Sequence, residues 1–444
     1  MNTAIIQSID IQSLLSRIPA YGICRVAYSG GIDSTALLHI LYRQRQQLSS
    51  PLRAVHVDHQ LHPHSREWTQ HCQQQCEKLG IDLQVITVDA SPPRGESPEA
   101  WARKMRYEAI CRQMNDNDIL FTAHNKDDQA ETLLLQLVRG AGPEGLASMP
   151  EVRHMHTGWL VRPLLQYSKE QLREYNRQHK LEWIEDSSNQ ETRMDRNYLR
   201  HVVMPALVSR WPGALHTISR SARHQAELMQ IAREMAETDS RDVVSDTDRK
   251  TLCIRRLQLL SDTRQKNLLR YWIKSNQFPL PGRHIINRIL SEVIPARPDA
   301  LPCLQWNGAE IRRYRDRLYL MEKLPAIDNS ICLNWNIKQE LQLPHGCLRA
   351  DRCMGDGISD GRLQNHVLTV AFRQGGETIH LPGRQHKQTL KKLFQEADIP
   401  VWQRDRLPLL YIDGKLAAVS NHWIDRDFQA GTDEGGWKIS FRTG

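Results

Sequence analysis

The sequence predicts an α/β protein that opens with a doubly wound parallel sheet of the Rossmann-like kind. Two observations lead to this class. Short apolar runs alternate with helix-like segments over roughly the first two hundred residues, as they do in parallel α/β sheets. A glycine pair also follows the first apolar run directly, where such folds place a phosphate-binding turn. We expect a helical domain and a small α+β domain to follow this sheet.

The strand and helix candidates alternate in order along this first part. Another helix begins near Asp127 and ends at glycines 140 and 142, which can supply C-cap geometry. Strands are predicted at 23–28, 52–57, 83–88 and 118–123, and helices at 35–48, 65–79 and 97–114.

The sequence changes character after about residue 211, and again near 324–343. Helices are predicted at 215–237, 264–275 and 283–292, with an exposed, polar connection at 238–250. Later β-like runs at 367–372, 409–412 and 416–419 accompany one basic helix at 388–397. We therefore predict domains at 1–212, 213–325 and 345–444.

Length and composition restrict the class of protein. The 444 residues exceed what a single core usually supports. No apolar run approaches the roughly 20 residues that span a bilayer, and the first residues lack the pattern of a signal peptide. We expect no membrane contact and a cytoplasmic location. The nine cysteines include no CxxC pair, which argues against a zinc ribbon or a thioredoxin-like site.

The net charge of +8 and the pI of about 9.0 suit a polyanionic partner such as a nucleic acid. Many basic proteins bind no nucleic acid, so the charge alone favours such a partner only modestly. The sequence does not determine the oligomeric state, and a homodimer is possible.

The most informative string lies between the first strand and the helix that follows it. Two glycines let the backbone approach an anion, and the start of the helix directs its free N–H groups at that anion. An aspartate repels phosphate, so its presence here indicates a Mg²⁺ ligand or a group that orients a donor. The GK[ST] ending of a Walker A loop is missing. The string consists of Ser29, Gly30, Gly31, Ile32, Asp33 and Ser34.

Polar residues at two further strand ends should join this loop. Asp58 follows the second strand and His124 the fourth. Ligands of doubly wound sheets bind beyond the carboxyl ends of the strands, so these side chains are predicted to line one crevice. Histidines 56, 59, 62 and 64 are interpreted as nucleotide contacts or surface residues rather than as metal ligands.

A dense polar string begins at His124 and continues into the predicted helix. Asp128, Glu131 and Thr132 share one helix face. Asp127 and Asp128 also suit the first turn of a helix, where acids are favoured. Helix capping explains one or two of these acids, but it does not explain the histidine, the two aspartates and the glutamate together.

These strings resemble a known family. SGGIDS at 29–34 is similar to the PP-loop of N-type ATP pyrophosphatases, which cleave ATP to AMP and pyrophosphate. The segment HNKDDQAET at 124–132 and the run that follows it resemble the tRNA(Ile)-lysidine synthetase family. Further similar motifs are the helix containing Arg103 and Arg106, RPLL at 162–165, DSSN at 186–189 and RNYLR at 196–200.

The resemblance implies a reaction. ATP with Mg²⁺ adenylates the C2 oxygen of cytidine 34 in the CAU anticodon of tRNA(Ile), and the ε-amine of L-lysine then displaces AMP. It also implies residue roles. The loop, Asp58 and Arg106 would bind ATP, Asp33 would hold Mg²⁺, and His124 and Asp127 would assist the reacting centre. Asp128 and Glu131 would bind the lysine ammonium and Arg200 its carboxylate.

The C-terminal part resembles the tRNA-binding domain of the same family. A basic helix beside an aromatic residue suits contacts with a phosphate backbone. The residues predicted to contact RNA are Arg384, Lys387, Lys391, Lys392 and Arg404.

Two alternatives remain open. Other PP-loop enzymes thiolate tRNA, but the two-thiocytidine and thiouridine groups use cysteine pairs that are not recognisable here. A non-catalytic RNA-binding protein could keep the fold, although carboxylates near RNA phosphates lower affinity unless they take part in chemistry.

Overall fold

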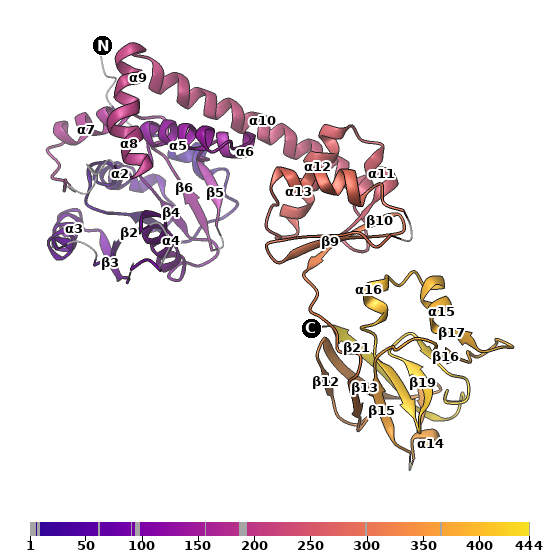
Figure 1. Cartoon of the computed structure of the whole chain (residues 1–444). Coiled ribbons are helices and arrows are strands. Elements are labelled where there is room, and N and C mark those ends of the chain that lie inside the picture. The colour runs from indigo at the N-terminus through magenta and orange to yellow at the C-terminus, as the bar shows by residue number, and fades with distance from the viewer. Residues whose placement is uncertain are drawn as a thin grey trace. The chain divides into compact units, whose positions relative to one another are not determined.

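The computed structural model describes residues 6, 9–60, 63–89, 91–93, 98–155, 157–185, 193–297, 300–364 and 366–443 (Figure 1). The chain forms two compact units, which divide after Glu234 within a long helix. Among the described residues, none of the helices contains an apolar stretch long enough to cross a lipid bilayer.

The N-terminal unit is built on a mainly parallel sheet in the order β3-β2-β1-β4-β6-β5. The neighbours from β3 to β6 pair in parallel, and β5 pairs antiparallel with β6 at the edge. The strands are β1 (Cys24–Ala27), β2 (Leu52–Asp58), β3 (Asp82–Thr87), β4 (Ile119–Phe121), β5 (Val152–His154) and β6 (Trp159–Val161).

Helices cover both faces of this sheet. Residues alternate between the faces along each strand, so Ile119 and Phe121 join the core beneath α2 and α7, while Leu120 joins the core beneath α4. The helices and short turns are α1 (Ile11–Leu15), α2 (Ile32–Arg43), η1 (Arg45–Gln47), α3 (Ser65–Leu79), α4 (Pro98–Cys111), α5 (Lys126–Val138), α6 (Pro143–Leu146), α7 (Lys169–Gln178), α8 (Asp195–Tyr198), η3 (Leu199–Val203), α9 (Met204–Arg210) and α10 (Ala214–Val243).

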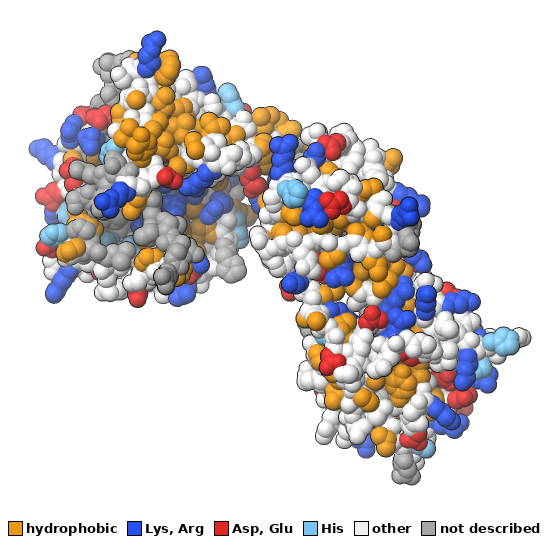
Figure 2. Space-filling model, in the orientation of Figure 1, with side chains coloured by type: hydrophobic (Ala, Val, Ile, Leu, Met, Phe, Trp, Pro, Cys, Tyr) orange, Lys and Arg blue, Asp and Glu red, His pale blue; other side chains and the backbone are white. Residues whose placement is uncertain are grey.

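An apolar surface lies on α8, η3 and α9. Figure 2 shows apolar side chains gathering over these elements. Its large exposed members are Met194, Tyr198, Val202, Val208 and Trp211.

The second unit begins with helices packed on an antiparallel sheet in the order β7-β10-β9-β8. The sequence predicted the helices but not this sheet, three of whose strands follow one another from residue 303 to 322. The elements are β7 (Thr251–Cys253), α11 (Ile254–Gln258), α12 (Asp262–Ser275), α13 (Arg283–Arg288), η4 (Ile289–Val293), β8 (Cys303–Trp306), β9 (Ala309–Tyr314) and β10 (Arg317–Glu322).

The last part of the chain forms three further antiparallel sheets. One has the order β11-β15-β18-β19-β20, a second the order β12-β13-β21-β14, and a third pairs β16 with β17. The elements are β11 (Cys332–Asn334), β12 (Leu341–Leu343), β13 (Gly346–Met354), β14 (Ile358–Ser359), α14 (Asp360–Leu363), β15 (Leu368–Ala371), β16 (Thr378–Ile379), β17 (Gln388–Thr389), α15 (Leu390–Glu396), α16 (Val401–Arg404), β18 (Leu409–Ile412), β19 (Lys415–Val419), β20 (Trp423–Ile424) and β21 (Gly435–Thr443).

The prediction of a connection at 238–250 is wrong in its first part, because α10 continues to Val243. Val243 is only 2% exposed and packs in the core of the second unit. Asp239, also buried, forms an ion pair with Arg264 of α12. Polar composition suggested an exposed segment, but tertiary contacts with α12 extend the helix.

Candidate active site

The glycine-containing loop lies at the switch point of the sheet. It joins β1 to α2. From β1 the chain forms β2 and β3 on one side and then crosses to β4 on the other side, so the strand order reverses at β1. Doubly wound sheets bind ligands at this point, beyond the carboxyl ends of the strands. The ends of β2 and β4 bring Asp58 and His124 to the same edge, as the sequence predicted.

Gly30 gives the loop its shape. Its φ of +78° lies in the left-handed region that favours glycine. A Cβ at this position would come within 2.7 Å of Ile184 Cδ1 and 3.1 Å of Cys72 Sγ. The backbone therefore needs glycine here both for its conformation and for its close packing.

Residues far along the chain, in and just after α7, hold the loop through two hydrogen bonds. The Ile184 N–H donates to the Gly30 carbonyl at 2.9 Å. Asn176 on α7 is fully buried, and its Nδ2 donates to the Ile32 carbonyl at 2.8 Å. These contacts fix the direction in which the loop enters α2.

The start of α2 suits an anion. Gly31 is its N-cap, and no side chain caps the helix start within the described part of the chain. The first N–H groups are thus left for a ligand, and the helix dipole favours negative charge there. Ser29 Oγ and Ser34 Oγ lie 3.1 Å apart beside this turn and can also donate to a ligand.

Asp33 lies in the first turn of α2. Its Oδ1 atom is buried and has no hydrogen-bond partner among the described residues. Burial raises the pKa of Asp33 to about 6; Asp128 and Asp127 also raise it, whereas Lys169 and Arg200 lower it. An unsatisfied buried oxygen is costly, and Mg²⁺ is commonly held by one carboxylate together with substrate phosphates. Asp33 therefore fits the predicted metal ligand.

His124 is a partly buried imidazole that is neutral at pH 7. An Nη of Arg103 lies 3.3 Å from its Nε2, and Thr122 Oγ1 lies 2.9 Å from its Nδ1. Because arginine can only donate, Nε2 carries the lone pair and Nδ1 donates its proton to Thr122. Burial lowers the pKa of His124, and Arg103 lowers it further, although Asp128 opposes this.

Asp128 and Glu131 form a network with two arginines. Arg196 donates to Glu131 at 2.9 Å and to Asp128 at 3.0 Å. Arg200 donates to Glu131 at 2.7 Å and to Asp128 at 3.3 Å. The Glu131 side chain is only 2% exposed. Two guanidinium groups thus neutralise two carboxylates on one face of α5.

The other carboxylate of this helix start is held differently. The Asp127 Oδ2 atom accepts a hydrogen bond from the Lys169 backbone N–H at 2.8 Å. Burial raises the pKa of Asp127, and this hydrogen bond partly offsets the effect. Asp127 therefore links α5 to the start of α7.

Asp58 and Arg106 lie on the other side of the loop. Asp58 Oδ1 accepts from the Gln60 N–H at 2.9 Å. Arg106 Nε donates to His59 Nε2 at 3.2 Å. Burial lowers the pKa of His59 to about 4, so this ring is also neutral at pH 7.

The predicted RNA-contacting residues lie in the second unit. Lys387, Lys391 and Lys392 are exposed on or beside α15, and Arg384 pairs with Glu396 at 3.0 Å. Arg404 differs from the prediction, since it is only 6% exposed. Its Nε donates to the Ile399 carbonyl at 2.8 Å, so this guanidinium supports the fold rather than facing solvent.

Three site neighbours were not assigned from the sequence. Arg196 precedes Arg200 by one helical turn, and this spacing could have identified it. Thr122 lies only two residues before His124, but a threonine there carries no comparable signal. Lys169 carries none either, because the fold alone brings it to Asp127. The DSSN motif at 186–189 lies outside the described residues.

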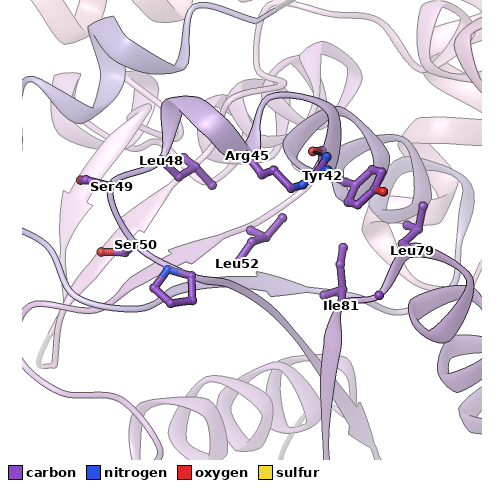
Figure 3. A pocket seen from close by; sticks show the side chains of 10 residues that line it. Tyr42, Arg45, Leu48, Ser49, Ser50, Leu52, Leu79 and Ile81 are labelled. Carbon is purple, nitrogen blue, oxygen red and sulfur yellow. Dashed lines mark hydrogen bonds between the residues drawn. The ribbon is translucent and has the colours of Figure 1, made fainter.

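Two observations restrict where a ligand would bind. Among the described residues, no group of three or more His, Cys, Asp or Glu side chains could hold a metal ion by itself. A cavity of about 540 Å³ lies at the opposite end of β2, near Tyr42, Leu52 and Ile81 (Figure 3). Its lining contains no carboxylate, and it is separate from the loop.

The fold and the loop define a PP-loop protein that uses ATP. Residues 6–207 match the PP-loop domain, 252–319 the TilS substrate binding domain and 368–441 the TilS substrate C-terminal domain. The chain is 43% identical over 416 residues to the tRNA(Ile)-lysidine synthase of Coxiella burnetii, covering 93% of this chain and 92% of that protein.

Two further relatives agree. The tRNA(Ile)-lysidine synthases of Methylococcus capsulatus and Pectobacterium atrosepticum are 38% and 37% identical. They cover 92% and 97% of this chain, and 94% and 97% of their own lengths. The chain belongs to the tRNA(Ile)-lysidine synthase family, an enzyme family of the ligase class. The resemblance found in the sequence is confirmed.

Proposed function

We propose that this chain joins L-lysine to C2 of cytidine 34 in the CAU anticodon of tRNA(Ile). ATP first adenylates the C2 oxygen and pyrophosphate leaves. The lysine ε-amine then forms the C2–N bond while the C2–O bond to AMP breaks. The lysidine produced changes the codon that is read from AUG to AUA.

One observation carries this proposal. Helix α7 contacts both parts of the site: Asn176 Nδ2 donates to the Ile32 carbonyl of the phosphate loop at 2.8 Å, and the Lys169 N–H donates to Asp127 Oδ2 of α5 at 2.8 Å. This shared support favours one site for the nucleotide loop and the acidic–arginine network. Positioning ATP beside an amino-acid pocket is what a ligation through an adenylated intermediate requires.

The network suits a charged amino acid. Lysine carries a carboxylate and two ammonium groups near neutral pH. Arg200 can pair with the carboxylate, while Asp128 and Glu131 can accept from an ammonium. The ammonium must lose a proton before attack, and Asp127, whose pKa burial raises, is the proposed acceptor.

The loop has a separate role in this scheme. Ser29, Ser34 and the first N–H groups of α2 bind phosphate oxygens, and Asp33 holds Mg²⁺, which would neutralise phosphate charge when bound. Neutral His124 can accept a hydrogen bond at Nε2 once Arg103 turns to the nucleotide. Asp58 and Arg106 complete the nucleotide side.

We also propose domain limits at 1–212, 213–325 and 345–444, and RNA contacts from Arg384, Lys387, Lys391 and Lys392.

The direct test uses labelled lysine and unmodified tRNA(Ile) with a CAU anticodon, together with ATP and Mg²⁺. Label that survives mild alkali is bound through a C–N bond to a base, since an aminoacyl ester would be cleaved. AMP release without stable label, or label transfer from a sulfur donor instead, would contradict the proposal.

A pair of variants assigns the lysine pocket. Asp128→Asn should raise KM for lysine on the order of tenfold, because one acceptor of the ammonium loses its charge. Asp116→Asn removes the same charge from an exposed position and should leave KM unchanged. An unchanged KM in Asp128→Asn would remove Asp128 from the pocket.

A further inference from the structure

A groove of about 640 Å³ lies between the start of α5 and one face of α10 in the N-terminal unit. On α10 its lining includes His216, Arg220, Arg223 and Gln230, which recur at helical spacing along one stripe. From 216 to 230 the stripe is about 21 Å long, at 1.5 Å per residue. This length suits an extended, chain-like ligand better than a compact one.

The groove carries positive charge that the protein does not neutralise. Arg17 pairs with Glu151 at 3.0 Å. The lining then still contains three cations, Lys126, Arg220 and Arg223, and only one further acid, Glu227. Arg220 and Arg223 are exposed and form no ion pair with any residue that the structure describes.

Lys126 and Arg223 lie close enough to repel each other. Burial lowers the pKa of Lys126, and Arg223 lowers it further, although Asp127 partly offsets both effects. Unpaired cations that face one another across a groove form a favourable environment for an anion.

The groove is coupled to the proposed active site through α5. Lys126 and Gln129 line the groove, whereas Asp128 and Glu131 lie on the opposite face of the same helix and bind the arginines. Ser219 Oγ of α10 donates to the Lys126 carbonyl at 3.2 Å, which fixes α10 at this helix start. The groove is thus about one helix diameter, roughly 10 Å, from the carboxylates.

We infer that this groove binds backbone phosphates of the RNA substrate beside the nucleotide that reacts. The inference rests on the proposed function, because it takes tRNA as the substrate. The length of the groove and its two exposed, unpaired arginines match the repeated negative charges of a phosphodiester chain. Phosphate contacts would hold the RNA in register with the α5 carboxylates without reading its sequence.

The test measures binding of full-length protein to unmodified tRNA(Ile) at several KCl concentrations, without ATP or lysine. Arg220→Ala/Arg223→Ala should weaken binding on the order of tenfold and lower the slope of log K against log salt by about 1.4 to 1.8. Arg220→Lys/Arg223→Lys keeps the charges and should retain most of the slope.

The control is Arg45→Ala/Arg241→Ala, which removes two charges from exposed positions outside the groove. It should bind as the unaltered chain does. An unchanged slope in Arg220→Ala/Arg223→Ala would overturn the inference, as would weaker binding of free ATP by that variant, since the groove would then serve the nucleotide. If the unaltered chain binds no tRNA or forms no lysidine, the proposed function itself fails.

Discussion

The proposed active site and the C-terminal basic helix use charge in opposite ways. In the first, Glu131 is 2% exposed and its carboxylate oxygens receive hydrogen bonds from two arginines. In the second, Lys391 and Lys392 are exposed on α15, while Leu390, Leu393 and Phe394 face the core. Buried charges depend on their partners for stability, whereas exposed charges act mainly at a distance and are screened by salt.

This difference predicts how each region responds to mutation. Changes around the loop and network should alter chemistry and stability together and depend little on salt. Changes on α15 should alter only RNA binding, and their effect on affinity should disappear at high salt. Four predictions compare buried with exposed positions, beginning with the largest expected effect.

Gly30→Ala should reduce tRNA-dependent release of AMP about 100-fold, because the new Cβ must move either Ile184 or the loop. The left-handed φ of +78° should also cost about 1–2 kcal/mol of stability. Gly142→Ala is the matched control, since its φ is −75° and a Cβ there meets no atom within 4 Å. Normal turnover by Gly30→Ala would show that loop geometry does not limit the chemistry.

Glu131→Gln should lower the free energy of unfolding by about 1–3 kcal/mol, because Arg196 and Arg200 lose a shared carboxylate. KM for lysine should rise as well. Glu170→Gln breaks an exposed pair with Arg173, and we expect a change below about 1 kcal/mol. Chemical denaturation of the three proteins measures the difference. Equal losses of unfolding free energy in both variants would show that burial of the charge does not determine its contribution to stability.

Acid should destabilise the N-terminal unit through His39. Burial lowers the pKa of His39 to about 4, and His179 and Arg43 lower it further. The unfolded chain therefore binds a proton more readily between about pH 6.5 and pH 4, so stability falls as pH falls through this window. His39 is only half-buried, and we expect a loss of about 1 kcal/mol from pH 7 to 5.

His39→Gln keeps a side chain that can hydrogen-bond to Tyr175 and removes this titration. Thermal unfolding at pH 7 and pH 5 should therefore show a smaller acid shift for the variant than for the unaltered chain. The same acid shift in both proteins would assign the effect to other groups.

Lys391→Ala/Lys392→Ala should have the smallest effect. The affinity for tRNA should fall a few-fold at low salt, and the difference should vanish near 1 M KCl. KM for ATP and for lysine should not change. Lys338→Ala/Lys415→Ala, at exposed positions outside α15, controls for net charge. A loss that persists at high salt would place these lysines in specific contacts rather than in a screened field.

For the proposed site, the sequence was informative where residues depend on local pattern. Gly30, Asp33 and the carboxylates of α5 stand in short strings next to strand ends, so the rules of parallel sheets placed them at one edge. It could not predict the partners that folding brings from elsewhere. Lys169 meets Asp127 across a separation of 42 residues, and no pattern marks that pairing.

The same distinction explains the errors in the fold. The ends of α3 and β18 follow from periodicity and agree with the prediction. The extension of α10 to Val243 depends on α12, and the polar composition of this segment suggested the opposite. The residues around Arg404 in the sequence suggested a basic surface position. In the structure its guanidinium is buried and donates to the Ile399 carbonyl.

The bracing of the phosphate loop also has a consequence for biosynthesis. The contacts from Asn176 to Ile32 and from Ile184 to Gly30 join positions more than 140 residues apart. Such long-range contacts form late, because closing a long loop costs entropy before the contact stabilises it. A nascent chain cannot complete its nucleotide site until residue 184 has left the ribosome. Translation itself therefore delays nucleotide binding until most of the N-terminal unit has been made.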